Sequence, residues 1–280
     1  MRVTFVGEIR DAGIKFALEQ VDQRLKTDWR FADANLGSTQ EDPAALACPF
    51  DSDCLVVVVN HRGELDQPSL QSFVENNPLI PVLFLLSSHC EGLDHNRKQW
   101  PGVLQIYWHK FAFCYSMVAR QWARQGSSDW HLPLTTSFAD RRLQQATPDL
   151  DLRNCRVGIT SLDQTELAAL GDELAADSAE VITWGIQQAR MASQVGDDLD
   201  ALVISGELTD PEVVDLLLEV PKLHSPPSVI VLQNFPRPET VAKLIKNGAT
   251  HVMSKPLERF ELSWAVSRFR KFDRLVSELS

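Results

Sequence analysis

The sequence predicts two α/β domains in tandem, each a parallel sheet wound with helices on both faces. Short β-branched apolar runs alternate with segments of helical periodicity along the 280-residue chain, which is typical of doubly wound parallel sheets. The segment at 53–58, an aspartate followed by an apolar run, matches 200–205, and the segment at 82–86 matches 229–233, both at an offset of 147 residues. A repeated order of elements at a fixed offset indicates a tandem repeat of one fold.

Elements of the first half, residues 1–126, alternate as this fold requires. Strands are expected at residues 2–6, 28–34, 55–59, 80–86 and 103–108. Helices are expected at residues 12–26, from 43, from 68 and at 112–125. The third helix begins at Pro68, whose missing N–H is tolerated in a first turn. The continuous β-branched run at 55–59 is typical of a strand buried on both faces of a parallel sheet.

A segment at residues 127–153 separates the two halves. Gly126 and the two serines after it end the preceding helix, and prolines keep the rest of the segment irregular. Trp130 and Phe138 make the segment too apolar for a free tether. We therefore expect a partly ordered linker that packs on a domain.

The second half, residues 154–280, repeats the order more clearly. Strands are expected at residues 156–160, 180–184, 201–205, 228–232 and 250–253. Helices are expected at residues 164–176, 186–195, from 211, at 238–246 and at 258–279. Five strands alternating with five helices predict a flavodoxin-like (βα)5 fold in each half, with ligands at the carboxyl ends of the strands.

Composition and charge limit the possible functions. Hydrophobic residues make up 44% of the chain, but no apolar run approaches the ~20 residues of a membrane helix, and no signal-peptide layout opens the chain. The five cysteines form no C-x-x-C pair and indicate reduced thiols. A formal net charge of −11 opposes binding to nucleic acid and anionic lipid. We expect a cytoplasmic protein without nucleic-acid or membrane partners and without a cofactor.

One motif near the end of the chain points to a family. Gly248-Ala249 ends a helix, a short apolar strand comes next, and Lys255-Pro256 leads into the last helix. This order resembles the fifth strand and Lys-Pro turn of response-regulator receiver domains. The resemblance implies a lysine that contacts a phosphoryl group on an aspartate at the end of strand three. It also implies an acidic pair after strand one that holds Mg²⁺, a hydroxyl after strand four and an aromatic residue in strand five.

Apart from Lys255, the second half lacks these residues. Their replacements are Ser161 and Leu162 for the acidic pair (with Asp163 one position late), Ser205 for the aspartate, Gln233 for the hydroxyl and Val252 for the aromatic residue. Serine cannot form an acyl phosphate, and leucine cannot bind Mg²⁺. The resemblance therefore implies a degenerate receiver whose site is not phosphorylated.

The first half fits the same pattern less closely. Glu8 stands at the second acidic position, Val58 (or Asn60) at the place of the aspartate, and Lys110 at the place of the lysine, with Phe111 after it instead of proline. We expect this half, too, to remain unphosphorylated.

Three polar clusters have simple structural interpretations. His89, Cys90 and His95 share one loop but match no common zinc spacing, so we expect a polar loop and no metal. Asp197, Asp198 and Asp200 fit a solvated turn before a strand. The basic residues of the last helix, from Arg268, are favourable near a helix C-terminus.

Aromatic residues at helical spacing mark the last helix as a candidate interface. The candidates are Trp264, Phe269 and Phe272, with Trp122 on the equivalent helix of the first half. One interpretation is that these residues cover the sheet. The other is that part of the helix pairs with another copy of the chain or with the first half.

Together these features predict a non-catalytic signalling protein. We expect a tandem pseudo-receiver that docks on other signalling proteins, with a possible homodimer through the C-terminal helix. The alternative is a sensor of a small anionic ligand, such as a nucleotide second messenger, at the former phosphorylation site. An enzyme is disfavoured because the chain has neither a glycine-rich phosphate loop nor a G-x-S-x-G motif.

Overall fold

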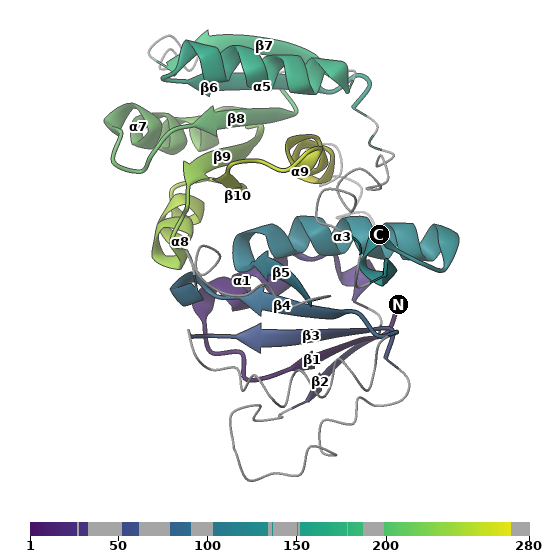
Figure 1. Cartoon of the computed structure of the whole chain (residues 1–280). Helices are drawn as coiled ribbons and strands as arrows, with labels where there is room; N and C mark the ends of the chain where they lie inside the picture. Colours follow the sequence, from purple (N-terminus) through teal and green to yellow (C-terminus); the bar gives the residue numbers. More distant parts are fainter. Residues whose placement is uncertain are drawn as a thin grey trace. The chain divides into compact units, whose positions relative to one another are not determined.

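Two compact units make up the chain in the computed structural model, Met1–Ala146 (unit 1) and Thr147–Ser280 (unit 2). The structure describes residues 1–26, 28–32, 52–61, 79–90, 103–133, 136, 150, 152–177, 179–186 and 199–269. The division between the units falls inside the segment 127–153 that we expected to be a linker. Each unit is described by itself (Figure 1).

Unit 1 contains a five-stranded parallel sheet in the order β2-β1-β3-β4-β5. Its main elements are β1 (Val3–Val6), α1 (Ala12–Gln20), β2 (Trp29–Ala32), β3 (Cys54–Val59), β4 (Val82–Leu86), β5 (Val103–Tyr107) and α3 (Trp108–Gln125). The central strands β3 and β4 are fully buried, as their uninterrupted apolar runs predict. The helices expected from 43 and from 68 lie outside the described residues.

The start of the expected linker packs on unit 1. Residues Asp129–His131 form a short 3-10 helix, and Trp130 is buried with its ring 6.2 Å from that of Tyr115 on α3. The Nε2 atom of His131 lies 3.0 Å from the backbone oxygen of Asp53. Trp130 therefore belongs to the core of unit 1, and for this reason this part of the segment is not a free tether.

Unit 2 contains a second five-stranded parallel sheet in the order β10-β9-β8-β6-β7. Its elements are β6 (Arg156–Ser161), α5 (Gln164–Ala176), β7 (Glu180–Gly185), β8 (Ala201–Ser205), α7 (Pro211–Glu219), β9 (Ser228–Asn234), α8 (Pro238–Lys246), β10 (His251–Lys255) and α9 (Glu261–Phe269). Both sheets have the flavodoxin-like order 2-1-3-4-5, so the predicted fold class is confirmed. Apart from Ile186, the helix expected at 186–195 lies outside the described residues, as does the last helix beyond 269.

Strand register in unit 2 aligns the residues that the receiver motif singles out. Ser161 at the end of β6 pairs with Ser205 at the end of β8, and Lys255 at the end of β10 pairs with Asn234 on β9. The adjacent parallel strands β6 and β8 form the point where strand order reverses, which is where ligands bind in such sheets. Helices α5 and α9 also contact each other. Because β6 ends at Ser161 and α5 begins at Gln164, the N-terminus of α5 lies close to this edge.

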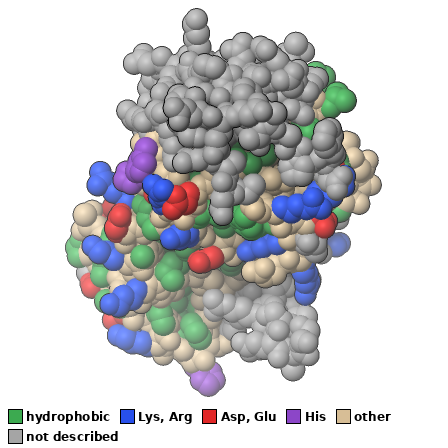
Figure 2. Space-filling view, turned by 90° about the horizontal axis from the view of Figure 1, so that it is seen from below, with side chains coloured by type: hydrophobic (Ala, Val, Ile, Leu, Met, Phe, Trp, Pro, Cys, Tyr) green, Lys and Arg blue, Asp and Glu red, His purple; other side chains and the backbone are tan. Residues whose placement is uncertain are grey.

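Charged side chains of both signs are interspersed with hydrophobic ones on the described part of the face shown in Figure 2. Among the described residues, no helix combines the length and the apolar character needed to cross a membrane.

Candidate functional site

The site at the carboxyl edge of the unit 2 sheet is built around Glu166, a residue that the receiver pattern does not include. Asp163 is the N-cap of α5, and its Oδ1 accepts hydrogen bonds from the backbone N–H groups of Thr165 (2.7 Å) and Glu166 (3.3 Å). Capping fixes where the helix begins, so Glu166 lies in its first turn, at the edge of the sheet. From there its side chain reaches across the ends of three strands.

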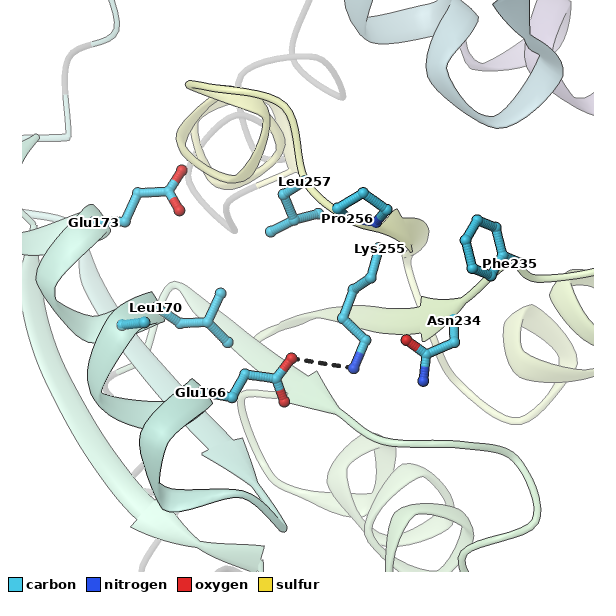
Figure 3. Close-up of a pocket in the computed structure, with 9 residues that line it drawn as sticks. Glu166, Leu170, Glu173, Asn234, Phe235, Lys255, Pro256 and Leu257 are labelled. Carbon is cyan, nitrogen blue, oxygen red and sulfur yellow. Dashed lines mark hydrogen bonds and ion pairs between the residues drawn. The ribbon is translucent and has the colours of Figure 1, made fainter. Parts of the chain in front are cut away.

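Glu166 contacts one polar side chain at the end of each of these strands, β6, β8 and β10. Its Oε2 accepts hydrogen bonds from the hydroxyls of Ser205 (2.6 Å) and Ser161 (2.9 Å). Its Oε1 lies 3.1 Å from Nζ of Lys255, the contact drawn in Figure 3. Lys255 Nζ also lies 3.2 Å from Oγ of Ser205. These four residues, which we call the Glu166 cluster, form a closed network.

The electrostatics of the cluster favour an ionised Glu166. Partial burial acts to raise the pKa of this carboxyl, but the hydrogen bonds from Ser205, Lys255 and Ser161 and the charge of Lys255 outweigh it and lower the pKa. The side chains of Lys255 and Glu166 are 21% and 26% exposed, so water screens their attraction only in part. A carboxylate of the chain itself therefore neutralises the lysine.

The cluster lacks the groups that aspartyl phosphorylation requires. A serine ends β8 where an acyl phosphate would need a carboxylate. Leu162, half exposed at 52%, stands where an oxygen ligand of Mg²⁺ would be needed. Among the residues that the structure describes, no group of three or more His, Cys, Asp or Glu side chains is placed to hold a metal ion.

Gln233 takes a structural position outside the Glu166 cluster. Its side chain is buried, and its Nε2 donates a hydrogen bond to the backbone oxygen of Gly206. The next residue, Asn234, donates from its backbone and side-chain nitrogens to Oε1 of Glu207 (3.0 and 2.8 Å). Both residues tie the end of β9 to the loop after β8. Val252, at the place of the aromatic residue, is buried in the core.

A pocket of about 490 Å³ opens beside the Glu166 cluster (Figure 3). One wall is the face of α5 that carries Glu166, Leu170 and Glu173. The opposite wall is formed by the turn Lys255-Pro256-Leu257, and Asn234 and Phe235 complete the lining. The volume is within the usual range for ligand pockets, roughly 300–1,000 Å³.

At the equivalent edge of unit 1, the strand register places a different residue at the position equivalent to Lys255 of unit 2. The repeat places Leu86 over Gln233, and their partners on the next strand are Tyr107 and Ser254. The residue after Tyr107, which is the buried Trp108, is therefore the counterpart of Lys255. Lys110 lies two residues further, in the first turn of α3, so this register does not align it with Lys255.

Among the described residues, the other unit 1 positions form no network like that of Glu166. Val58 is buried in the core, and its backbone oxygen lies close to Gly7. Glu8 forms an ion pair with Arg10, and both side chains are more than 60% exposed. Asn60 instead organises the loop after β1, because its Oδ1 accepts from the backbone of Arg10 (3.4 Å) and its Nδ2 donates to the backbone oxygen of Glu8 (2.8 Å).

The interface candidates lie in different environments. Trp264 is 2% exposed, with its ring 5.9 Å from His251 on β10, so it belongs to the interior. Phe269 is half-buried and stacks on His251 with a centroid distance of 4.4 Å. Trp122 is half-buried with its ring 4.6 Å from His131. Phe272 lies outside the described residues.

The loop considered for a metal is described only in part. Cys90 is buried, and its thiol donates to the backbone oxygen of Val59 at 3.5 Å. His89 is exposed, with its ring 5.2 Å from that of His61. His95, like Asp197 and Asp198, lies outside the described residues.

Glu166 is the functional residue that sequence reasoning missed. The receiver pattern has no acidic residue at this point of the helix, so comparison by motif passes over it. The available signal was Asp163 with Glu166 three residues later, a spacing typical of helix N-termini. In a capping box the glutamate turns back to the N-cap backbone, whereas here it turns to the strand ends.

Comparisons with known proteins identify structural neighbours only. No family model matches the chain, and no curated protein is similar to it at a significant level. A response regulator receiver domain protein from Clostridium thermocellum is 20% identical, with a TM-score of 0.39, and the match covers 44% of this chain and 98% of that one. A receiver domain of a signal transduction histidine kinase from Syntrophus aciditrophicus is 15% identical, with a TM-score of 0.37, and the match covers 41% and 89%.

A third neighbour has a length similar to that of the whole chain. It is described as a two-component system response regulator/GGDEF domain protein, and the match covers 99% of this chain and 100% of that one, at 13% identity and a TM-score of 0.40. At such identities the neighbours say nothing of what this chain binds. The strand order of the two sheets assigns the fold without them.

Proposed function

We propose that the chain is a non-catalytic signalling protein of the response-regulator type, which acts by docking on other proteins without aspartyl phosphorylation. The observation that carries this proposal is the Glu166 cluster. The lysine that would contact a phosphoryl group is already paired with a carboxylate of the same chain, and the strand end that would carry the phosphoryl group is Ser205. A fold of this kind with an internally neutralised site is suited to binding and unsuited to phosphoryl transfer.

The experiment that tests this proposal is incubation with acetyl phosphate and Mg²⁺ and a subsequent intact-mass measurement. An active receiver domain in the same reaction serves as the positive control. We expect the control to gain about 80 Da, the mass of one phosphoryl group, and this chain to keep its mass. A stable adduct on Ser205 or on any aspartate would overturn the proposal.

The cluster also bears on the anionic-ligand alternative. An anion that binds Lys255 has to displace Glu166 and then remain beside its carboxylate, which repels it. A nucleotide at 100 times its dissociation constant would add about 2.7 kcal/mol to the free energy of unfolding. We expect no shift of the melting temperature across a nucleotide panel, and a shift that is lost in Lys255→Ala would favour the sensor over the docking protein.

A further inference from the structure

The pocket beside α5 has an excess of negative charge. Three ionisable side chains line it, namely Glu166, Lys255 and Glu173. Because Glu166 and Lys255 neutralise each other, the charge of Glu173 remains. The pocket therefore attracts a cation and repels an anion.

Glu173 lacks a cationic partner among the described residues. It lies one and two turns along α5 from Leu170 and Glu166, on the same face. Its side chain lines the pocket and extends from the helix on the side of Leu257 (Figure 3). Its pKa is raised, first by burial and then by the negative charge of Asp177. A half-buried carboxylate beside a like charge is unfavourable in the free protein, and an incoming cation would relieve that cost.

Apolar surface surrounds this carboxylate and extends past the pocket. Leu170, Pro256 and Leu257 form the walls next to Glu173. Phe235 lines the opposite rim with 62% of its surface exposed. Its φ of +46° is a conformation in which a bulky residue is strained. Exposed rings are also favourable partners for a cation.

The extent of the apolar surface favours a protein over a small molecule. Leu162, half exposed, comes after β6 at the same edge of the sheet as Phe235, which comes after β9. A lone amine would fill part of the pocket and leave Leu162 and Phe235 in water. A protein segment can place an apolar side chain on this edge while a lysine or arginine stem lies along the pocket wall.

We propose that this pocket is a docking site for a protein segment that inserts a lysine or arginine side chain beside Glu173 and packs apolar neighbours on Phe235 and Leu257. The inference rests on the proposed docking function and names the chemistry of the partner. Arginine and lysine both carry apolar stems that suit Leu170, and the cationic head would pair with the carboxylate of Glu173.

A peptide selection tests the proposal on the full-length chain. Random peptides displayed on phage are selected for binding, and those enriched are synthesised and titrated at two salt concentrations. We expect peptides with a lysine or arginine next to apolar residues, with binding that weakens as salt rises. Binding should weaken about tenfold or more in Glu173→Gln and in Phe235→Ala.

The matched control is Asp172→Asn, which removes an exposed carboxylate one residue away from Glu173 and should leave binding unchanged. Glu173→Gln also removes an unfavourable charge, so a loss of binding cannot be ascribed to unfolding. Peptides without a cation, or binding that is equal in wild type and Glu173→Gln, would overturn the inference. A different outcome is that free arginine or spermidine shifts the melting temperature while no selected peptide depends on Glu173. That result would overturn the protein segment as the occupant and indicate a small amine instead.

The two proposals fail separately. Phosphorylation by acetyl phosphate would overturn the proposed function whatever the peptides show. An unmodified chain whose peptides ignore Glu173 would overturn the docking site alone.

Discussion

Glu166 and Glu173 show how two carboxylates on one helix face acquire opposite roles. Glu166 accepts hydrogen bonds from two serines and pairs with Lys255. Glu173, two turns later, faces apolar walls and the charge of Asp177. The difference lies in the groups that the strand ends and loops place opposite each residue, and this could not be inferred from the helix sequence. Lys255 and Ser205 were predicted as site residues, but the carboxylate that joins them was not.

Removing the charge of Lys255 should destabilise unit 2. In Lys255→Met the carboxylate of Glu166 keeps its two hydroxyl donors but loses its cation, and we expect a loss of about 1–3 kcal/mol in the free energy of unfolding. The double variant Lys255→Met/Glu166→Gln should recover most of the loss because no charge remains unpaired. Urea denaturation measures both.

The control for this pair is Glu180→Gln, which breaks the more exposed ion pair with Arg156. That change should cost less than about 0.5 kcal/mol. Equal losses for Lys255→Met and Glu180→Gln would show that the Glu166 cluster is no stronger than a surface ion pair.

Stability should depend on pH in opposite ways for the two carboxylates. The pKa of Glu166 is lowered in the folded chain from its ordinary 4.5, so its contribution is present above that value and is lost as pH falls through the folded pKa. The pKa of Glu173 is raised from 4.5, so its contribution is present below that value and is lost as pH rises through the folded pKa.

Substitutions by glutamine separate the two effects. Relative to wild type, Glu166→Gln should be less stable at pH 7 and approach wild type in acid. Glu173→Gln should be more stable at pH 7, and the gain should shrink as pH falls through the raised folded pKa and be gone below pH 4.5. Melting temperatures between about pH 3 and 8 test this, since most of the linkage lies near the carboxyl pKa values. Parallel profiles for the two variants would contradict the assignment.

Elements with continuous β-branched runs were predicted closely, and elements without end signals were not. β3 and β8 lie at the predicted runs because parallel strands buried on both faces leave a strong apolar pattern. α3 begins at Trp108, four residues before the predicted start. Its N-cap, Tyr107, forms no side-chain cap, so no residue type marks the helix start, and Lys110 was placed after the strand instead of inside the helix.

α9 shows a second limit of pattern reading at the element scale. Apolar spacing identifies a helix face but does not say whether the face covers a sheet or meets a partner. The structure buries Trp264 against β10, so Trp264→Ala should destabilise unit 2 by about 3–5 kcal/mol. Trp264→Phe, which retains an aromatic ring, should lose clearly less. Chemical denaturation measures both variants. If the stability of Trp264→Ala were close to that of the wild type, Trp264 would again be a candidate for an interface.

At the scale of the whole molecule, the chain consists of two sheets, each with its own core. The repeat was visible in the sequence because equivalent strands share an offset, and the strand order is a property of the fold class. The arrangement at each site was less predictable, because loops differ between the two copies while the strands keep the same apolar pattern. Unit 2 has a polar network at the point where its strand order reverses. At the equivalent point of unit 1, the backbone of Val58 lies close to Gly7.

Separate cores should unfold in separate steps. Tyr115 in unit 1 is fully buried, and its hydroxyl accepts from Trp29 Nε1 (2.6 Å) and donates to the backbone oxygen of Leu25 (2.9 Å). Tyr115→Phe should lower the melting temperature of one calorimetric transition only, and Trp264→Ala that of the other. One transition that moves with both variants would show that the units unfold together.

The pairing of Glu166 with Lys255 also has a consequence for how the activity of the protein is regulated. In a phosphorylated switch, the fraction of modified molecules carries the signal, and the number of molecules can stay constant. A chain that supplies its own counter-ion offers one state of this site, so under the proposed function its effect scales with its concentration. Synthesis and degradation of the protein would then set the output, and its dosage in the cell would be the variable that its partners read.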